Sequence, residues 1–353
     1  MQSSFKTLLH SSSKLKGKPV SKLELNLKST LINGQCFFWH PVPNQNFRLF
    51  SGVFKTSHLY LRENDQGIIE FCEYPEMPSL NQELNDYFQL NVNMGELIEY
   101  WNSQDEHFKG LSEKIQGLRI LQQEPLSCLI SFLCSQNNNI SRITQMLSNL
   151  TSKYGTFICE RDTIKYYSFP TLSQLAEIKE NDLRNMGFGY RANYVVASVQ
   201  KIIEKGGVEW LNGLKGKEKK EIREELLNLK GIGLKVADCI ALFSLDCNSC
   251  IPVDTHIWQI YQKVYKKDKK ETKLNKKNYD LISDFFEKKF EKYPGWAHSL
   301  LFTADLPEFK SEIEGGEKNE KNKKKKKINE RDNEDLMESC NVKELISKKP
   351  KKK

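Results

Sequence analysis

Hydrophobic and polar residues follow two different periods along this chain, and the change of period divides it in two. Between residues 23 and 73, short stretches alternate apolar and polar positions, as in LELNL, FRLFSGVF and HLYLRE. Alternation with a period of two predicts strands, and the interruptions at Asn33-Gly34, Pro41 and Gly67 predict hairpin turns. We therefore expect an antiparallel sheet in this part of the chain.

From residue 90 onward the apolar residues recur with the period of a helix. The segment LSCLISFLCSQNNNISRITQMLSNL, residues 126–150, places most of its large apolar side chains on one face. The polar residues Ser135 to Asn139 interrupt this face, so they are expected to end one helix and cap the next. No internal repeat is present.

These periods predict an α+β protein with two domains and two less ordered ends. An antiparallel β-rich domain is expected over residues 21–115, packed on a mainly α-helical domain over residues 116–306. Residues 1–20 are predicted to be a flexible extension. Residues 307–353 are predicted to be a disordered tail, because Lys, Glu and Asn dominate them and little apolar surface is available for burial.

Charge and cysteine content narrow the class of protein. The formal net charge is +8, and residues 307–353 contribute 15 − 11 = +4 of it, so the body is only mildly basic. This balance is compatible with a polyanionic partner but also with an ordinary solvated surface. No apolar run approaches the roughly 20 residues that span a bilayer. The nine scattered cysteines, without a secretory signal, predict free thiols in a reducing compartment.

The ends of the chain bear on localisation. Five consecutive lysines at 323–327 and KKPKKK at 348–353 suit a nuclear-import or nucleic-acid-tethering patch, although a solvated low-complexity tail has the same composition. The first 23 residues lack acids and carry Ser and Lys but no Arg, which gives weak support to a transit peptide. A nuclear protein is expected, with mitochondrial delivery as the alternative.

Residues 229–239 read LKGIGLKVADC and predict a helix-hairpin-helix. Leucines end one helix before Gly231 and Gly233, and an apolar stripe beginning at Val236 continues in the next. The free N–H groups at the start of the second helix, with the positive end of its dipole, form an anion site. A simple helix C-cap explains a two-glycine turn equally well.

Lys235 and Asp254 add a candidate for chemistry. A lysine at a helix start is disfavoured as a cation by the dipole, and partial burial would further favour the neutral amine needed for nucleophilic attack. Asp254, in PVDTH, precedes another helical segment and could orient this amine or stabilise a cationic sugar. A surface lysine and an N-capping aspartate are the ordinary explanations for the two residues.

Five segments, in chain order, resemble one known family. They are NGQCFFW at 33–39, CSQNNNISRIT at 134–144, MGFGYRANY at 186–194, LKGIGLKVADC with PVDTH within 229–256, and GWAHSLLFTADL at 295–306. Together they are similar to the eukaryotic 8-oxoguanine DNA glycosylase/lyase, a helix-hairpin-helix base-excision repair enzyme. The resemblance covers roughly residues 20–306, nearly all of the chain before the tail.

The resemblance implies a role for each matching residue. Lys235 would attack C1′ of the damaged nucleotide and form a Schiff base that permits β-elimination, and Asp254 would support this step. The family binds double-stranded DNA containing oxidised guanine, acts as a monomer and requires no catalytic cofactor, but a structural cation at the hairpin carbonyls is implied. The positions that hold backbone phosphates correspond to Gly231, Gly233, Val236 and His256.

Excision of a base from a duplex requires that its nucleotide be rotated out of the stack. By resemblance, Asn137 fills the vacated space, Tyr190 is a wedge, and Arg142 with Arg191 reads the unpaired cytosine. The Gly34 carbonyl would accept the N7 proton that distinguishes 8-oxoguanine from guanine. Without the family, capping and core packing would explain most of these positions. The remaining residues of the implied base pocket are Cys239, Pro252, Phe243, His298 and Phe302.

The sequence departs from the family pattern at four positions. His298 stands where the family has the glutamine that reads the Watson–Crick edge of the purine, and a neutral imidazole cannot reproduce an amide's donor and acceptor pair. Lys230 replaces the proline before the hairpin glycines. Phe38 replaces a basic residue, and Phe243 replaces a smaller apolar one. Lesion preference is therefore open, and an altered lesion preference is the main alternative function.

Two further alternatives carry less support. A non-catalytic DNA-binding module would keep the hairpin but would require neither Lys235 nor Asp254. The related glycosylases with an iron–sulfur cluster have four closely spaced cysteines after the catalytic aspartate, whereas only Cys340 follows Asp254 here. Cys247 and Cys250 have the spacing of half a zinc site, but no second pair accompanies them.

Overall fold

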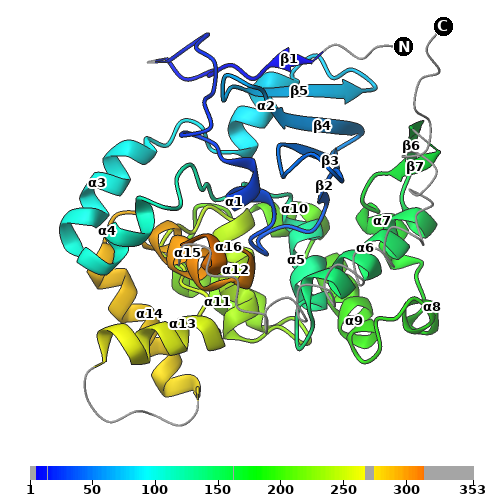
Figure 1. Cartoon of the computed structure of the whole chain (residues 1–353). Helices are drawn as coiled ribbons and strands as arrows, with labels where there is room; N and C mark the ends of the chain where they lie inside the picture. The colour runs from blue at the N-terminus through cyan, green and yellow to red at the C-terminus, as the bar shows by residue number, and fades with distance from the viewer. Residues whose placement is uncertain (1–4, 14, 162, 267–273, 314–353) are drawn as a thin grey trace, which may run out of the picture.

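A five-stranded antiparallel sheet forms the N-terminal part of the molecule (Figure 1). The computed structural model describes residues 5–13, 15–161, 163–266 and 274–313. The spatial order of the strands is β1-β5-β4-β3-β2. Their bounds are β1 (Lys6–Thr7), β2 (Trp39–Pro41), β3 (Leu49–Phe54), β4 (Ser57–Glu63) and β5 (Ile69–Tyr74).

The alternating pattern of the sequence becomes the two faces of this sheet. In β3, side chains alternate between partly exposed and buried, and Phe50 and Phe54 lie on the buried face. Two short helices, α1 (Leu27–Leu31) and α2 (Leu80–Tyr87), add leucines to the same apolar cluster. The predicted antiparallel sheet is confirmed.

The remainder of the chain is mainly helical and has an apolar core of its own. At its centre lies α5 (Pro125–Cys134), in which every residue except Ser127 is buried. The next helix, α6 (Ile140–Tyr154), is capped by Asn139, whose side chain accepts from the N–H of Arg142. The helix end and cap predicted over residues 135–139 are therefore confirmed.

The remaining helical elements complete the domain. They are α3 (Met94–Gln104), α4 (Glu106–Ser112), α7 (Leu172–Ala176), α8 (Glu180–Asn185), α9 (Arg191–Glu204), α10 (Gly207–Asn212), α11 (Lys219–Leu227), α12 (Leu234–Ser244), α13 (Thr255–Ile260), the π-helical η1 (Tyr261–Tyr265), α14 (Lys276–Phe290), α15 (Pro294–Asp305) and α16 (Pro307–Ile313). Of these, α9, α10 and α12 contact α5 directly. No helix in the described ranges is both long and apolar enough to cross a membrane.

The structure differs from the predicted domain limits at the N-terminus. β1 pairs with β5, Leu8 donates its N–H to the Ile69 carbonyl at 2.9 Å, and Leu8 and Val20 are fully buried. The prediction of a flexible extension over residues 1–20 is wrong for its described part, because these apolar residues extend the sheet and its core. Residues 1–4 lie outside the described ranges.

The predicted limits at residues 115 and 307 also differ from the structure. α3 and α4, predicted within the β-rich domain, supply Trp101 and Phe108 to the helical core. The predicted tail begins too early, because Pro307–Ile313 form α16 and bury Phe309. The lysine clusters of the tail lie in residues 314–353, outside the described ranges.

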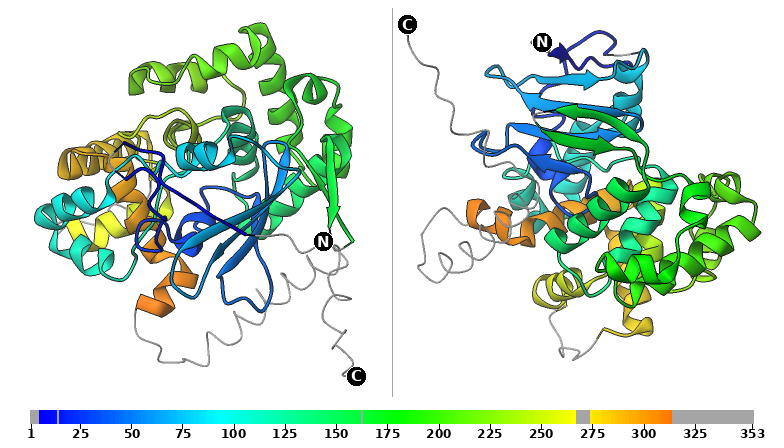
Figure 2. Two further views of the ribbon diagram at one scale, coloured as in Figure 1. Left: turned by 90° about the horizontal axis from the view of Figure 1, so that it is seen from above. Right: turned by 90° about the vertical axis from the view of Figure 1, so that its right-hand side faces the viewer.

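A second, two-stranded sheet interrupts the helical domain and was not predicted. β6 (Phe157–Arg161) and β7 (Ile164–Tyr167) pair antiparallel and lie beside the large sheet (Figure 2). The rings of His58 in β4 and Tyr166 in β7 lie 3.8 Å apart, centroid to centroid. This hairpin therefore joins the two domains along one side of the space between them.

Candidate active site

A cavity of about 2540 Å³ lies between the sheet domain and the helical domain. The segment around Gly34 and Phe38 lines it from the sheet domain, and the starts of α12 and α13 line it from the helical domain. Seven of the predicted site residues take part in the lining: Gly34, Asn137, Lys235, Val236, Asp254, His256 and Phe302. The two domains thus bring together residues that are far apart in the sequence.

The predicted helix-hairpin-helix is present as α11, a glycine turn and α12. Gly231 has φ of +84°, and a Cβ there would lie 2.4 Å from the Tyr194 ring. Gly231 is therefore required by this ring and by its backbone conformation. Among the described residues, a Cβ at Gly233 would meet nothing within 4 Å, and no side chain caps α12 at this position. The first N–H groups of α12 consequently remain available to an outside acceptor.

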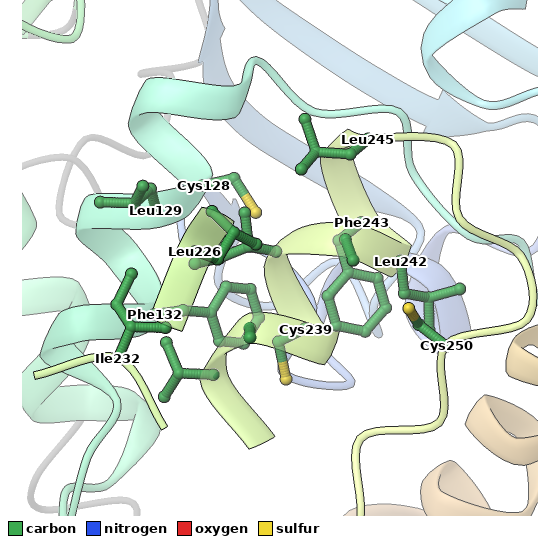
Figure 3. Close-up of a cluster of buried hydrophobic side chains, with 14 of the residues drawn as sticks. Cys128, Leu129, Phe132, Leu226, Ile232, Cys239, Leu242, Phe243, Leu245 and Cys250 are labelled. Atoms are coloured by element: carbon green, nitrogen blue, oxygen red, sulfur yellow. The ribbon is translucent and has the colours of Figure 1, made fainter. Parts of the chain in front are cut away.

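Lys235 lies in the first turn of α12 and is half-buried. Its ammonium nitrogen lies 5.4 Å from the centroid of the Phe132 ring. Phe132 stacks in turn on Phe243, with 5.5 Å between the ring centroids, and Figure 3 shows both rings in one cluster with Cys239. The stacked rings of Phe132 in α5 and Phe243 in α12 therefore form an aromatic layer beside Lys235, the candidate nucleophile.

Cys239 follows Lys235 by one helical turn and is 3% exposed. Burial raises the pKa of its thiol to about 11, although the charge of Lys235 acts in the opposite direction. The thiol is therefore protonated near neutral pH and presents a small apolar face.

Asp254 ends the buried stretch of Pro252 and Val253 and is the N-cap of α13. Its Oδ1 accepts a hydrogen bond from the N–H of Ile257 at 3.0 Å, which is the ordinary capping role. The same carboxylate also lines the cavity with Lys235. The charges of Asp254 and Lys235 both affect the pKa values of the buried Cys239 and His298. Asp254 thus caps α13 and also lies at the cavity.

His298 lies in α15 and is 4% exposed. Its Nε2 lies 3.1 Å from the Pro252 carbonyl, which can only accept, so Nε2 carries the proton. Nδ1 is buried, and none of the residues that the structure describes offers it a partner within hydrogen-bond distance, although the Gly295 backbone also acts on the ring. Burial lowers the pKa of His298 to about 4, so the imidazole is neutral near neutral pH.

The loop between α5 and α6 has an unusual backbone at the predicted space-filling residue. Asn137 is exposed and has φ of +46°, in the left-handed region. Tyr190 is 46% exposed and donates its hydroxyl to the Gln136 carbonyl at 3.2 Å. Both side chains therefore stand at the surface.

The two predicted arginines differ in their environments. Arg142 is exposed and makes a long contact of 3.4 Å with the Gly187 carbonyl. Arg191 is 3% exposed, and its guanidinium donates to the carbonyls of Gln136 and Asn137. Arg191 thus supports the loop backbone, a role that the sequence did not predict.

A buried polar network positions Gly34, and the sequence reasoning missed it. Asn33 donates to the Thr303 hydroxyl at 3.3 Å, which joins the Gly34 turn to α15. Gln35 bonds to several backbone groups, and Gln123 donates to the Gln35 carbonyl at 2.7 Å. The sequence did contain a signal of this network, because the polar residues Asn33 and Gln35 flank the Gly34 turn within an apolar segment.

His256, near the start of α13, is held by a carboxylate from another helix. Its Nδ1 lies 2.8 Å from Asp305 Oδ2, and Lys310 of α16 lies 3.2 Å from the other oxygen of Asp305. The side chain of His256 remains 40% exposed at the cavity. Asp305 therefore fixes the ring and leaves Nε2 directed away from the pair.

The other predicted residues lie around the cavity without lining it. Pro252, Phe243, Cys239 and His298 are buried. Arg142, Tyr190, Gly231 and Gly233 are at least partly exposed between the hairpin and the loop of Asn137, and Arg191 is buried beneath that loop. The structure therefore separates an inner group from an outer group.

Two family profiles match adjoining parts of the chain. Residues 18–129 match the N-terminal domain of 8-oxoguanine DNA glycosylase, and residues 130–283 match the HhH-GPD superfamily of base excision DNA repair proteins. The boundary between the two matches lies within α5.

Characterised relatives match over most of their own length. The chain is 38% identical to the N-glycosylase/DNA lyase OGG1 of Arabidopsis thaliana, over 82% of this chain and 79% of that protein. It is 34% identical to the N-glycosylase/DNA lyase of Saccharomyces cerevisiae, over 81% of this chain and 85% of that protein.

A solved structure has the same architecture. The 8-oxoguanine glycosylase/lyase of Clostridium acetobutylicum, in complex with double-stranded DNA containing cytosine opposite 8-oxoguanine, superimposes with a TM-score of 0.70 at 30% identity. The superposition covers 79% of this chain and 91% of that chain. Its apo form gives a TM-score of 0.71 at 29% identity, covering 81% of this chain and 94% of that chain.

Proposed function

The chain belongs to the 8-oxoguanine DNA glycosylase/lyase family of base excision repair and is an N-glycosylase/DNA lyase, and we propose that Lys235 excises 8-oxoguanine opposite cytosine through a Schiff base. One observation carries the proposal. An amine at a helix start and a carboxylate at another helix start line the same interdomain cavity and act on the same buried residues, Cys239 and His298.

The proposed reaction begins at the amine of Lys235. Its lone pair attacks C1′ of the damaged nucleotide, the N-glycosidic bond breaks, and its electron pair leaves with the base, which takes up a proton. The adduct opens to a Schiff base between Nζ and C1′. Loss of a proton from C2′ then expels the 3′ phosphate by β-elimination, and hydrolysis of the imine releases the amine.

Asp254 supports this reaction electrostatically in the proposal. Positive charge develops on the sugar as the base leaves, and a carboxylate held in place beside it lowers the energy of that state. The bond from the Ile257 N–H to Oδ1 fixes the carboxylate before the substrate arrives, so little reorganisation is needed.

The DNA backbone is proposed to lie across the hairpin. The uncapped N–H groups at the start of α12, around Gly233 and Val236, suit a phosphate, and the open space at Gly233 permits its close approach. Gly231 shapes the same turn. His256 would hold a second phosphate through Nε2, with Asp305 on the other side of the ring.

The extruded base is proposed to enter the cavity between Gly34, Phe302 and the inner group of residues. The Gly34 carbonyl would accept the N7 proton of 8-oxoguanine, and this contact is worth a few kcal/mol against guanine, about the cost of an unmade hydrogen bond. Phe302 and Cys239 would face the two sides of the purine. Pro252, Phe243 and His298 would form the end of the pocket.

Four residues, Asn137, Arg142, Tyr190 and Arg191, are proposed to act on the opposite strand. Asn137 would fill the space of the extruded nucleotide, and Tyr190 would wedge the stack open. Arg142, which is exposed, is free to reach the unpaired cytosine. Arg191 would reach it only from its present position under the loop of Asn137, where it bonds to two carbonyls.

An altered lesion preference is the second candidate function, and His298 is the observation that favours it. The proton on Nε2 is directed at the Pro252 carbonyl, so the ring does not offer the purine edge the paired donor and acceptor of an amide. A His298→Gln variant should therefore change the relative rates on a panel of oxidised purines. An unchanged panel would remove this alternative.

No catalytic cofactor is part of the proposed reaction. A structural cation at the hairpin gains little support from the turn itself, because the carbonyls of Lys230 and Gly231 already accept hydrogen bonds from Ser198 and Gln136. The turn also contains no carboxylate. We derive no step through such an ion. Nuclear localisation and a monomeric state remain predictions.

Borohydride trapping tests the proposed nucleophile. On an 8-oxoguanine:cytosine duplex, wild type should form a covalent adduct and Lys235→Gln should form none. Lys230→Gln is the matched control, because Lys230 is an exposed lysine on the same turn. Equal trapping in wild type and Lys235→Gln would place the nucleophile elsewhere.

A further inference from the structure

Two cysteines form a compact turn just after α12. The backbone N–H of Cys250 donates to the carbonyl of Cys247 at 3.0 Å, which closes a four-residue turn. Within this turn the Cys250 thiol donates to the Cys247 sulfur, and the two sulfur atoms lie 3.0 Å apart. The spacing seen in the sequence is therefore a direct contact between thiols.

This geometry suits a disulfide. Disulfides join residues whose Cα atoms lie about 4.4 to 6.8 Å apart, and a hydrogen-bonded turn holds its first and fourth Cα atoms within about 7 Å. The sulfur atoms need to approach by only about 1 Å to reach the bond length of about 2.0 Å. Rotation of the two side chains can provide this approach without moving the turn.

The two sulfurs also differ in reactivity. The hydrogen bond from Cys250 lowers the pKa of Cys247 to about 7, against the opposing effect of burial. The Ser249 hydroxyl, 3.6 Å from the Cys247 sulfur, acts in the same direction. Burial raises the pKa of Cys250, so this residue remains a thiol. Thiolate reactivity is therefore concentrated on the more exposed of the two, at 7% against 0%.

We propose that Cys247 and Cys250 are a reversible dithiol–disulfide site that reacts with hydrogen peroxide. The Cys247 thiolate attacks one peroxide oxygen, the O–O bond breaks, and hydroxide leaves and takes up a proton to form water. The resulting sulfenic acid is attacked by the Cys250 sulfur, and the second water leaves as the S–S bond forms. In total, two thiols and one peroxide give one disulfide and two waters, and a dithiol reductant reverses the reaction.

The turn is placed to transmit this change to the helix of the base pocket. Asn248, between the two cysteines, accepts from Trp296 Nε1 at 2.8 Å through Oδ1 and from the N–H of Gly295 at 2.9 Å through its carbonyl. These bonds hold the start of α15, the helix that carries His298 and Phe302. Oxidation would lock the turn that anchors this helix.

The two thiols take no direct part in the proposed excision chemistry. Neither Cys247 nor Cys250 is among the residues that line the interdomain cavity. Loss of the disulfide chemistry would therefore leave borohydride trapping by Lys235 intact, and failure of the trapping would say nothing about the thiols. The two proposals can be rejected separately.

Peroxide treatment of the full-length protein tests the proposal. After graded exposure, free thiols are alkylated and the peptides are analysed by mass spectrometry. Cys72 in β5 is the internal comparison, because it has the same 7% exposure as Cys247. We expect a Cys247–Cys250 disulfide at peroxide concentrations at least tenfold below those that modify Cys72, and its loss on treatment with dithiothreitol.

A variant gives the complementary result. Cys250→Ser removes the resolving sulfur, so Cys247 should proceed to sulfenic and sulfinic acid at the same low peroxide concentrations. Because Cys250→Ser can fail to fold, the proposal is accepted or rejected on the wild-type measurement alone. A wild-type Cys247 that stays reduced until Cys72 reacts, or that becomes sulfinic acid without a disulfide, would overturn the proposal.

Discussion

The side-chain amide of Gln136 donates a hydrogen bond to the Gly231 carbonyl at 2.8 Å. The backbone carbonyl of Gln136 in turn accepts from the Tyr190 hydroxyl at 3.2 Å and from the Arg191 guanidinium at 3.0 Å. One residue therefore connects the loop of Asn137, the hairpin turn and the start of α9. In the proposed complex these segments contact the opposite strand and the phosphates, so Gln136 sets the distance between them.

Replacement of Gln136 by Ala should lower kcat/KM for base excision about fivefold, the equivalent of one net hydrogen bond of about 1 kcal/mol. Single-turnover excision at saturating enzyme should show the loss, because alignment rather than affinity is changed. Gln145→Ala, an exposed glutamine in α6, is the control. Gln136→Glu should fail as Ala does, since a carboxylate cannot donate. A wild-type rate in both variants would exclude this role.

The bond between His256 and Asp305 should contribute to DNA affinity. Asp305→Ala frees the His256 ring, so we expect about fivefold weaker binding to DNA carrying an abasic-site analogue, measured by fluorescence anisotropy. Asp305→Asn keeps an acceptor for Nδ1–H and should recover most of the affinity. Equal losses in both variants would indicate that the charge of Asp305, not its hydrogen bond, is required.

Acid should destabilise the protein through two buried histidines. Burial lowers the pKa of His298 and of His58 from 6.5 to about 4, and in His58 the charge of Arg161 adds to the effect. Between these values the unfolded chain binds protons that the folded chain does not bind. The effect of these two histidines on the free energy of unfolding is therefore constant above about pH 6.5, and through them the free energy of unfolding falls as the pH falls towards about 4.

Urea unfolding at about pH 7 and about pH 5 measures this dependence. Each histidine should account for a loss of about 2 kcal/mol between the two conditions. His298→Gln should remove about half of the pH-dependent loss, whatever its stability at neutral pH. His107→Gln, an exposed histidine, is the control. A pH dependence unchanged in His298→Gln would contradict the assignment.

A buried ion pair holds the hairpin together. Asp238 of α12 is fully buried and accepts two hydrogen bonds of 2.6 Å from Arg223 of α11 and one of 2.7 Å from the Tyr279 hydroxyl. Asp238→Ala should lower the free energy of unfolding by about 3 to 5 kcal/mol, because the mostly buried Arg223 loses its two short bonds and keeps only longer contacts with Asp280 and Ser283, at 3.6 and 3.4 Å. Chemical denaturation checks this value, and the exposed Glu224→Ala should change stability by less than about 0.5 kcal/mol.

Local patterns in the sequence predicted the elements whose cause is local. The period-two segments became the sheet, the polar break at residues 135–139 ended α5 and capped α6, and LKGIG formed the hairpin turn. The two thiols of CNSC meet because the turn itself places them together. In these cases the physical cause lies within a few residues of the pattern, so the sequence is sufficient.

Elements that depend on distant partners were missed or assigned wrongly. Leu8 and Val20 become ordered only because β5 and the sheet core accept them, and Phe309 orders α16 only against the packed body. The β6–β7 hairpin is supported by contact with β4. The composition of a short segment carries no information about these distant partners. It therefore predicted a flexible N-terminus, a tail that begins too early and a helical domain without strands.

The sequence by itself determined the class of the protein and its family, and it singled out Lys235 and Asp254 as the amine and the carboxylate of the proposed reaction. Only the tertiary structure decided what surrounds them. Gly231 is a glycine because of Tyr194, Arg191 is buried under the loop of Asn137 whereas Arg142 is exposed, and His298 is neutral because α15 and Pro252 enclose it. Burial and hydrogen-bond partners arise from segments far apart in the chain, and they decide the charge and direction of each group.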